Sequence, residues 1–456
     1  MSSQEKKVSE NETEQGVVEL GYAAPIPKKQ PGGIALVPQP SEDPKDPLNW
    51  PQRKKYTILA VLCLSAFSGL ASSLVNQLGF VAQARLYHKS LVEVSYSISA
   101  AVAGLAGGPL LLVPLSHVFG RSALIWWSLI GFAGPTFGGF IVEHVSWQNE
   151  FWWTVGLQCL VIVLGFFFLE ETGFTRPGEK DYPPRPDAFL ANRIATFFPG
   201  NKVAPRTSSS QVATYAAAPF LIGLSPVAVC TGTFTLVFFG WFVSVNTLLT
   251  VFLQEPEEEG GYAFTPQQNA AFTFSLWMGI ICAQVWGYML NDRIPIAIAH
   301  RKQGVWKPEY RLHSLWIPSV VIMPAGLGIF GATLQYHLHY MALALGSFMI
   351  TFAAMVSIPI AINYIAECFR GHATEVGGIM GLYRLGLGVA VPFFIESWLE
   401  AVNGPGWVFG MAAFLTLLVF LLIILLMWKG HSMRQVGFGL LTNDEDGVNV
   451  VGTQDS

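Results

Sequence analysis

The sequence predicts an all-α fold in which the helices form a polytopic membrane bundle, and composition gives the first reason. Of 456 residues, 52% are hydrophobic and 12% are charged, whereas soluble domains carry about 25% charged residues. The charges gather in residues 1–55 and 432–456, which leaves the middle of the chain nearly all apolar. Apolar runs of roughly 20 residues, enough to cross about 30 Å of hydrocarbon, follow one another through that middle. We therefore expect these apolar segments to lie in a lipid bilayer, which is the partner that the composition predicts.

The N-terminal arm, residues 1–50, is rich in Ser, Glu, Lys, Pro and Gly and has no periodic apolar pattern. Such a segment buries too little apolar surface to fold, so we expect a disordered cytosolic arm. It also lacks the apolar core of a cleavable signal peptide, so the first span is expected to direct insertion. About ten spans follow, near residues 57–80, 94–117, 123–142, 152–171, 227–253, 266–290, 314–334, 340–366, 376–398 and 406–428.

The placement of Lys and Arg predicts the orientation of these spans. Basic residues precede the first span and recur in the polar segment 173–225 and in the loop 291–313, which alternating spans place on one side. The opposite side carries the acidic run 255–259. Both termini are therefore predicted to be cytosolic.

The polar segment 173–225 contains Pro-Pro-Arg-Pro and a Ser run, so we interpret it as a cytosolic linker. It divides the membrane part into an N-terminal half of four spans, 51–172, and a C-terminal half of six spans, 226–430. Residues 431–456 are then a cytosolic tail.

The residue types also exclude several classes of protein. The net charge of −4 argues against a nucleic-acid partner. The five cysteines each stand alone in an apolar stretch, which favours small buried hydrophobes. The sequence holds no cluster of metal ligands, no selectivity-filter pattern, and no phosphate-binding glycine loop followed by Lys-Ser/Thr. We therefore expect no metal and no cofactor, and neither an enzyme, nor a channel, nor an ATP-driven pump.

An ordered series of motifs resembles the fungal drug:proton antiporters of the major facilitator superfamily (MFS), over most of the chain. The motifs are DPLNW at 46–50, PLSHVFGRS at 114–122, GFAGPTFGGF at 131–140, EFWW at 150–153 after Trp147, Glu171-Thr172, PEEEGGYAFTPQQNAAFTF at 256–274 and RL at 311–312.

The resemblance implies two halves of six helices that enclose a site at the membrane midplane. It further implies secondary active transport by alternating access, with proton-coupled efflux of a drug-like molecule, toxin or secondary metabolite. The proton gradient would supply the energy. We expect a monomer in the plasma membrane, with a vacuolar or endosomal membrane as the alternative.

The first half departs from the resembling family. Residues 121–130 look like the start of the family's third helix, and 131–140 like the motif of its fifth. The resemblance therefore implies an internal deletion of about two helices, roughly 20 residues each with their loops. The family's fourth helix lines the cavity and carries an arginine used in proton coupling. Two alternatives to efflux stay open: a transport-incompetent or regulatory truncated variant, and an uptake carrier for a small nutrient or organic cation.

Polar and aromatic residues within the spans are the candidates for a substrate cavity, because amphipathic molecules need apolar walls with a few polar groups. An amide inside a span must find hydrogen-bond partners, so it faces protein or water. The candidates are Asn76 and Gln77 in the first span, Trp241 and Asn246 in the fifth, Trp277 and Gln284 in the sixth, and Asn363 and Tyr364 in the eighth.

Proton coupling requires a titratable group whose burial changes between states. Glu367 and Arg384 are the candidates. Glu367 could instead be a helix-end carboxylate that faces headgroups or pairs with Arg370. Arg384 could instead be paired or snorkel to the cytosolic interface, and Glu396 is expected near the outer face.

Two further motifs are expected to act in gating or packing. Glycines and a proline at 134–139 let helices approach closely and bend; they are Gly134, Pro135, Gly138 and Gly139. In the loop at 114–122, Gly120 and Arg121 match the resembling family. The acid and base that precede this pair in the family are replaced by His117 and Val118, so neutral His117 is not expected to supply the acid's charge.

Overall fold

The computed structural model describes residues 43, 46–74, 80–123, 125–126, 149–172, 183, 186–198, 209–257, 260–302, 306–369, 372–402 and 404–434. Contacts divide the chain into one unit of Met1–Tyr56 with Phe174–Lys180 and a second of Thr57–Gly173 with Asp181–Ser456.

In the first unit, the DPLNW motif forms a short helical turn, η1 (Pro47–Asn49). The Asp46 side chain caps this turn by accepting a hydrogen bond from the Leu48 amide at 2.9 Å. Lys54 Nζ lies 4.0 Å from the centre of the Trp50 ring, and Lys55 Nζ donates to the Leu48 carbonyl. The motif is thus a capped turn that leads into the first long helix.

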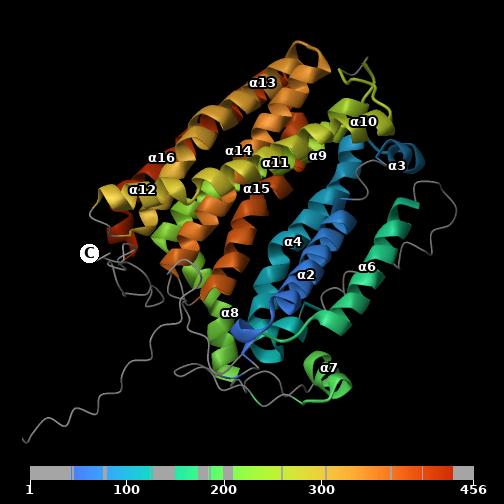
Figure 1. Cartoon of the computed structure of the whole chain (residues 1–456). Helices are drawn as coiled ribbons and strands as arrows, with labels where there is room; N and C mark the ends of the chain where they lie inside the picture. The colour runs from blue at the N-terminus through green and yellow to red at the C-terminus, as the bar shows by residue number, and fades with distance from the viewer. Residues whose placement is uncertain are drawn as a thin grey trace, which may run out of the picture. The chain divides into compact units, whose positions relative to one another are not determined.

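The remaining helices run in chain order (Figure 1). They are α2 (Gln52–Leu74), which starts in the first unit, α3 (Phe80–Tyr87), α4 (Leu91–Phe119), α6 (Asn149–Phe168), α7 (Phe189–Phe197), α8 (Ser209–Gly223), α9 (Pro226–Gln254), α10 (Pro266–Phe272), α11 (Phe274–Leu290), α12 (Arg293–Arg301), η6 (Pro308–Leu315), η7 (Ile317–Ile322), α13 (Met323–Gln335), α14 (Tyr340–Cys368), α15 (Ala373–Ala401) and α16 (Pro405–Arg434).

Eight segments of the described chain are long and apolar enough to cross a membrane, and each coincides with a predicted span. They are Gln52–Ser72, Leu91–Phe119, Pro226–Gln254, Gln267–Arg301, Pro308–Gln335, Tyr340–Cys368, Ala373–Ile395 and Pro405–Arg434. A shorter apolar helix, Trp152–Phe168, coincides with the predicted span at 152–171. Most of the predicted span at 123–142 lies outside the described residues. The prediction of a helical, polytopic fold is confirmed, while the number of spans stays a prediction.

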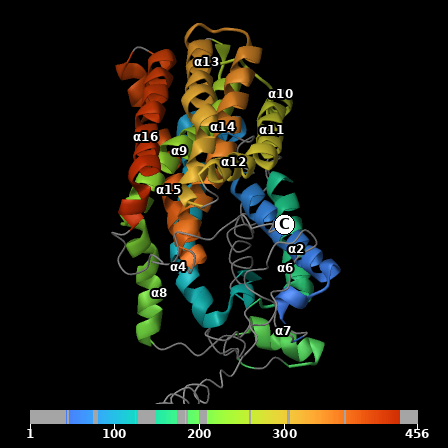
Figure 2. The ribbon, with the colours of Figure 1, turned by 60° about the vertical axis from the view of Figure 1, so that its left-hand side comes forward.

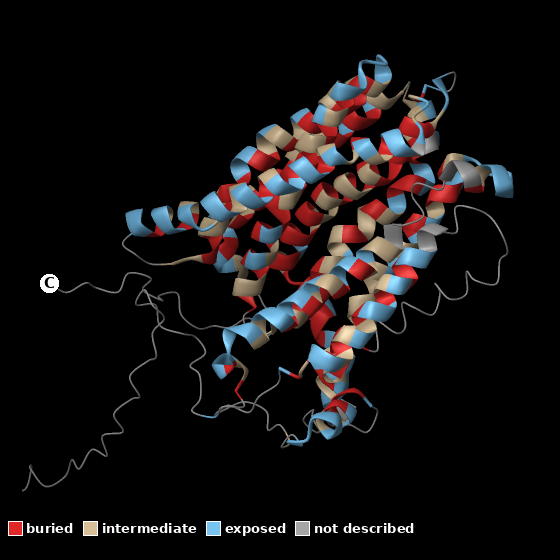
Figure 3. Cartoon of the chain, turned by 45° about the vertical axis from the view of Figure 1, so that its right-hand side comes forward, coloured by how far each residue is buried: buried red, intermediate tan, exposed pale blue. Residues whose placement is uncertain are grey.

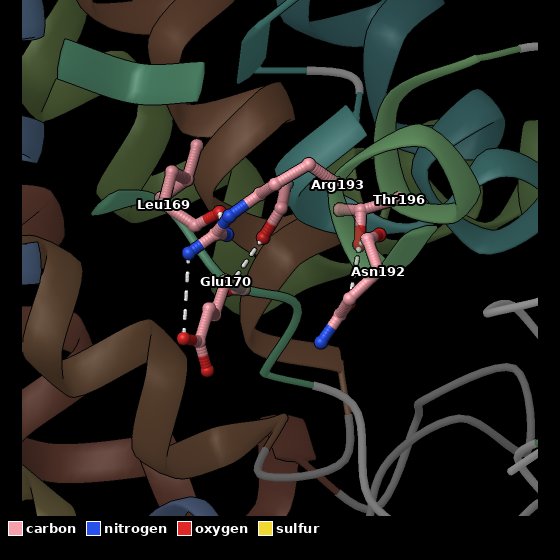
Figure 4. A network of polar contacts seen from close by, with 6 residues as sticks. Leu169, Glu170, Asn192, Arg193 and Thr196 are labelled. Carbon is pink, nitrogen blue, oxygen red and sulfur yellow. Dashed lines mark hydrogen bonds and ion pairs between the residues drawn. The ribbon is translucent and has the colours of Figure 1, made fainter. Parts of the chain in front are cut away.

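The segment predicted as a linker, 173–225, contains the helices α7 and α8. Arg193 of α7 is buried and donates to the Leu169 carbonyl at 2.6 Å and to Glu170 Oε1 at 3.4 Å (Figure 4). Burial lowers the pKa of the Arg193 guanidinium, and the charge of Glu170 opposes that shift. The guanidinium therefore fixes α7 to the C-terminal end of α6, and part of the linker has a fixed position.

The largest apolar core lies in the C-terminal part of the chain, where α9 is enclosed by α14, α15 and α16. Phe234, Phe238 and Trp241 of α9 are almost completely buried, together with Phe330 of α13 and Phe409 of α16. A helix that is apolar on every face is stable where protein or lipid covers each of those faces. Figure 3 shows the buried faces of these helices turned toward one another.

The span at Pro308–Gln335 is not one regular helix. It begins with the tight turns of η6, widens into a π-helical turn in η7, and becomes α-helical in α13. Pro318 and Pro324 lie in this stretch, and proline lacks the amide that a regular helix needs. Ser319 of η7 and Ser357 of α14 are both buried, and their hydroxyls form a hydrogen bond at 3.3 Å. The irregular turn is therefore tied to α14.

Helices α9 and α15 approach so closely that glycines are required between them. A Cβ added to Gly232 of α9 would lie 2.7 Å from the ring of Tyr383, and one added to Gly388 of α15 would lie 2.6 Å from Val243. The Tyr383 hydroxyl also donates to the Gly223 carbonyl at 3.1 Å. Small residues at such positions let helix backbones pack tightly without a hydrophobic driving force from water.

Helix α4 connects the N-terminal half to this pair. Val92, Ile98 and Val102 of α4 form a second buried cluster with Val251 of α9 and Leu385 of α15. Figures 1 and 2 both show α4 lying beside α15. The described contact between the two predicted halves is therefore carried by α4 against α9 and α15.

The Gly232→Ala substitution is expected to lower the stability of the purified protein by about 1–3 kcal/mol, because the ring of Tyr383 must move. Thermal unfolding in detergent measures the change. The control is Gly328→Ala in α13, whose added Cβ meets nothing within 4 Å. That variant should be neutral or gain about 0.5–1 kcal/mol from helix propensity. Equal stability of the two variants would contradict close packing at Gly232.

Candidate functional site

Ion pairs gather at the end of the bundle where α4, α11, α14 and α16 terminate and α15 begins. Glu367, near the end of α14, accepts a hydrogen bond from Arg311 Nε at 2.6 Å and one from Trp306 Nε1 at 3.3 Å. Arg311 Nη1 also donates to Asp292 at 2.9 Å. Arg370, the partner considered from the sequence, lies outside the described residues. Glu367 is therefore held in an ion pair by η6, although its assignment to proton coupling stays a prediction.

A second pair joins η6 to the last helix. Arg434 Nε lies 3.0 Å from Glu309 Oε1, and Arg434 Nη2 donates to Glu309 Oε2 at 3.3 Å. Glu309 is 6% exposed. A Cβ added to Gly430 would lie 2.9 Å from the Glu309 carboxylate and 3.1 Å from the Tyr364 hydroxyl. The glycine thus makes room for a buried carboxylate, and the pair closes the end of α16 onto η6.

His117 and Glu375 form the third pair, and it joins the two predicted halves. His117 Nε2 of α4 lies 3.0 Å from Glu375 Oε1 in the first turn of α15. His372 Nδ1 lies 3.8 Å from the same oxygen, and the His117 ring stacks on Tyr215 of α8 at 4.3 Å. The Glu375 side chain is only 4% exposed. A carboxylate at that depth must be hydrogen-bonded, so the contact fixes α4 against the start of α15.

The loop after α4 also has a defined partner. Gly120 ends α4 with a φ of 90°, a left-handed conformation that favours glycine, and an added Cβ would lie 2.6 Å from Glu171 Oε2. That carboxylate accepts hydrogen bonds from the Ser122 and Thr172 amides at 3.0 Å each. Arg121 is exposed. The structure thus brings together two sequence motifs, the Gly-Arg loop and Glu171-Thr172, which lie fifty residues apart.

Arg384 differs from the other buried cations. It lies on α15 with its guanidinium carbon 4.8 Å from the centre of the Phe239 ring of α9. Its Nε is buried without a hydrogen-bond acceptor, and no carboxylate of the described residues lies within ion-pair distance of it. A charge at the centre of a membrane helix costs at least about 2.5 kcal/mol unless it is paired or hydrated. An ion pair of Arg384, which is one alternative left open by the sequence, is therefore not seen in the described part of the chain, and the assignment of Arg384 to proton coupling stays a prediction.

The predicted cavity residues are not brought together as one lining. Trp241 packs in the core between Trp398 and Phe409, and Tyr364 is completely buried. Trp277 and Gln284 of α11 and Asn363 of α14 are exposed, and Asn246 of α9 is half-buried. Their roles stay predictions.

Several predicted site residues lie where the structure gives no description. Asn76 and Gln77 fall outside the described residues, as do Gly134, Pro135, Gly138 and Gly139. Glu396 lies in α15, but its side chain is not described. The functions assigned to these residues from the sequence stay predictions as well.

Sequence reasoning missed Arg311, Glu309 and Glu375 as members of the ion-pair cluster. Each lies near a helix end and outside the spans predicted from the sequence, so a search for charges within those spans passes over it. In the structure Glu309 and Glu375 are buried and Glu367 is half-buried, and each meets a base from another helix.

The comparisons with known proteins agree with the resemblance. Efflux pump radE of Floropilus chiversii is 24% identical over 86% of this chain and 83% of its own length. MFS-type transporter hepF of Aspergillus oryzae is 24% identical over 86% of this chain and 92% of its own length. Efflux pump vrtL of Penicillium aethiopicum is 23% identical over 83% of this chain and 86% of its own length. The chain is a homologue of fungal MFS-type transporters. No family model matches it.

This homology confirms the resemblance drawn from the motifs and the prediction that the chain is not an enzyme, since the relatives are named as transporters and pumps. Among solved structures, the match to the proton:xylose symporter XylE covers 85% of this chain and 81% of that symporter, at 16% identity and a TM-score of 0.38. The match to the human organic anion transporter MFSD10 covers 82% of this chain and 86% of that transporter, at 16% identity and a TM-score of 0.35.

A double-mutant cycle on His117→Ala and Glu375→Gln is expected to give a coupling energy of about 0.5–3 kcal/mol, because the two side chains are in direct contact. Thermal unfolding of the four purified proteins measures it. As a control, His117→Ala is combined with Glu367→Gln, whose contacts are Arg311 and Trp306. This second pair should be additive within about 0.5 kcal/mol. Additivity in the first cycle would exclude an energetic link between α4 and α15 through this pair.

Proposed function

We propose that this integral membrane protein exports a drug-like molecule, toxin or secondary metabolite by proton-coupled alternating access. The observation that carries the proposal is similarity to proteins named as efflux pumps over more than four fifths of the chain. In transporters of this kind, one half rocks against the other around a site near the midplane. The substrate is therefore a small organic molecule that enters between the halves, and no cofactor is involved.

We propose that the contact between α4 and α15 changes between the conformations of the transport cycle. His117 and Glu375 hold the two helices together at the end of the bundle that also carries the Arg311–Glu367 and Arg434–Glu309 pairs. We assign this end to the cytosol, because basic residues collect on the cytosolic side of membrane proteins. We propose that this contact closes the pathway toward the cytosol, and that export requires the His117–Glu375 contact to break and re-form in each cycle.

Proton coupling is assigned to the same end. Glu367 and Glu375 are each held by a basic side chain from another element, Arg311 and His117. A carboxylate that gains a proton loses most of its attraction to such a partner, so protonation would release the contact. The protein is proposed to act as a monomer in the plasma membrane, with both termini in the cytosol.

Proteoliposomes with an imposed pH gradient test export directly. The purified full chain is expected to drive gradient-dependent movement of at least one dye from a panel of hydrophobic fluorescent dyes. Collapse of the gradient with a protonophore should abolish that movement, and liposomes without protein serve as the control. Glu375→Gln should reduce the initial rate by roughly tenfold or more, since a charge-assisted hydrogen bond is lost. Absence of gradient-dependent flux, in preparations that unfold cooperatively, would favour the transport-incompetent variant.

A further inference from the structure

Arg384 occupies a position where a cation needs an anionic partner. Eleven residues separate it from Ala373 at the start of α15, so at about 1.5 Å per residue it lies roughly 16 Å along the helix. The segment Ala373–Ile395 is long and apolar enough to span a membrane, and the backbone of Arg384 lies near its middle. Three other arginines each contact a carboxylate of the chain: Arg193, which is buried, and Arg311 and Arg434, which are half-buried.

The neighbours of Arg384 are apolar on the side where it meets α9. The guanidinium lies over Phe239, and Leu385 beside it packs into the cluster formed with α4. The aromatic face offers a weak electrostatic partner but no acceptor for the N–H groups. The nearest acids along α15 are Glu375, which is held by His117, and Glu396, twelve residues away and more than three turns along the helix. The chain itself therefore leaves the charge of Arg384 unmatched among its described residues.

Open space adjoins the same face of α15. Gly377 and Gly381 lie seven and three residues before Arg384, which puts all three on one stripe of the helix. A Cβ added to either glycine would meet nothing within 4 Å. Gly388 lies four residues after Arg384 on the same stripe, where an added Cβ would meet Val243 of α9, and a Cβ at Gly386 would meet Leu236 of α9. The stripe is therefore covered by α9 after Arg384 and open before it, and Arg384 itself is half-buried.

We propose that Arg384 is the anion-recognition residue of the transport pathway and that the exported molecules are amphipathic organic carboxylates. This inference rests on the proposed function and deepens it by naming the substrate class. A carboxylate accepts two parallel hydrogen bonds from a guanidinium, which makes it the best geometric match among common organic anions. The apolar body of the same molecule would lie against Phe239 and the bare stripe of Gly377 and Gly381. Binding of the substrate supplies the missing counter-ion, and its release leaves the charge unmatched again.

Direct binding to the purified full chain in detergent tests the proposal. The probes are anthracene-9-carboxylate, pyrene-1-butyrate and naphthalene-2-acetate, each paired with its methyl ester, and fluorescence anisotropy gives both affinities. At least one acid should bind roughly tenfold or more tightly than its ester, because a hydrogen-bonded charge contact is lost in the ester. Equal or weaker binding of all three acids would overturn the proposal without any variant being made.

Variants then assign the preference to the residue. Arg384→Met should bring the affinity for the acid down to that of the ester and leave the ester unchanged. Arg384→Lys keeps a point charge but not the planar fork, so it should retain part of the preference. The control is Lys429→Met, which removes an exposed cation at the end of α16 and should change neither affinity. An undiminished preference in Arg384→Met, or in Arg384→Gln should the methionine variant fail to fold, would overturn the assignment.

The same probes in proteoliposomes separate this inference from the proposed function. A binding preference for acids without any gradient-dependent flux would support the anion site and contradict export. Flux of acids and esters with equal half-saturation concentrations would support export and overturn the anion site. The expected result is flux of both, with a half-saturation concentration for the acid that rises roughly tenfold in Arg384→Met while that of the ester stays constant.

Discussion

A carboxylate that is taken out of water is stable only when another group neutralises it or donates hydrogen bonds to it. This constraint accounts for the ion pairs at one end of the structure. Glu309, Glu367 and Glu375 are each drawn partly or wholly out of solvent, and each meets a base from a different element. Because the partners come from separate helices, every pair also ties two segments together. The requirement to satisfy charge thus becomes the means by which the helix ends are positioned.

Close packing in the interior depends on the same absence of water. Lipid is as apolar as the helix surfaces, so burial alone gives α9 and α15 little reason to associate. Gly232 and Gly388 remove the side chains that would hold the backbones apart, and the Tyr383 hydroxyl donates to the Gly223 carbonyl at the end of α8. The result is a closely packed pair of helices against which α4 lies.

The sequence predicted the helical class and all eight of the described spans, because apolar runs of membrane length, repeated along a chain, are typical of membrane helices. It did not predict which face of each helix is buried. Trp241 and Trp277 look alike in sequence, but one is 1% exposed in the core and the other 61% exposed on α11. Helices that are apolar all round carry no amphipathic stripe from which to derive a face. Long-range pairs were also out of reach, since Arg311 and Glu367 are 56 residues apart and His117 and Glu375 are 258 apart.

The His117–Glu375 contact shows why a motif should be compared by interaction as well as by residue type. The resemblance places an acid near the end of the helix that corresponds to α4, and its replacement by His117 suggested that the charge was lost. The structure instead places a carboxylate, Glu375, in the first turn of α15, where the helix dipole favours a negative charge. A neutral imidazole can still donate one hydrogen bond to that carboxylate, and a protonated one adds an ion pair. The contact between α4 and α15 is thus held by an acid that belongs to the C-terminal half.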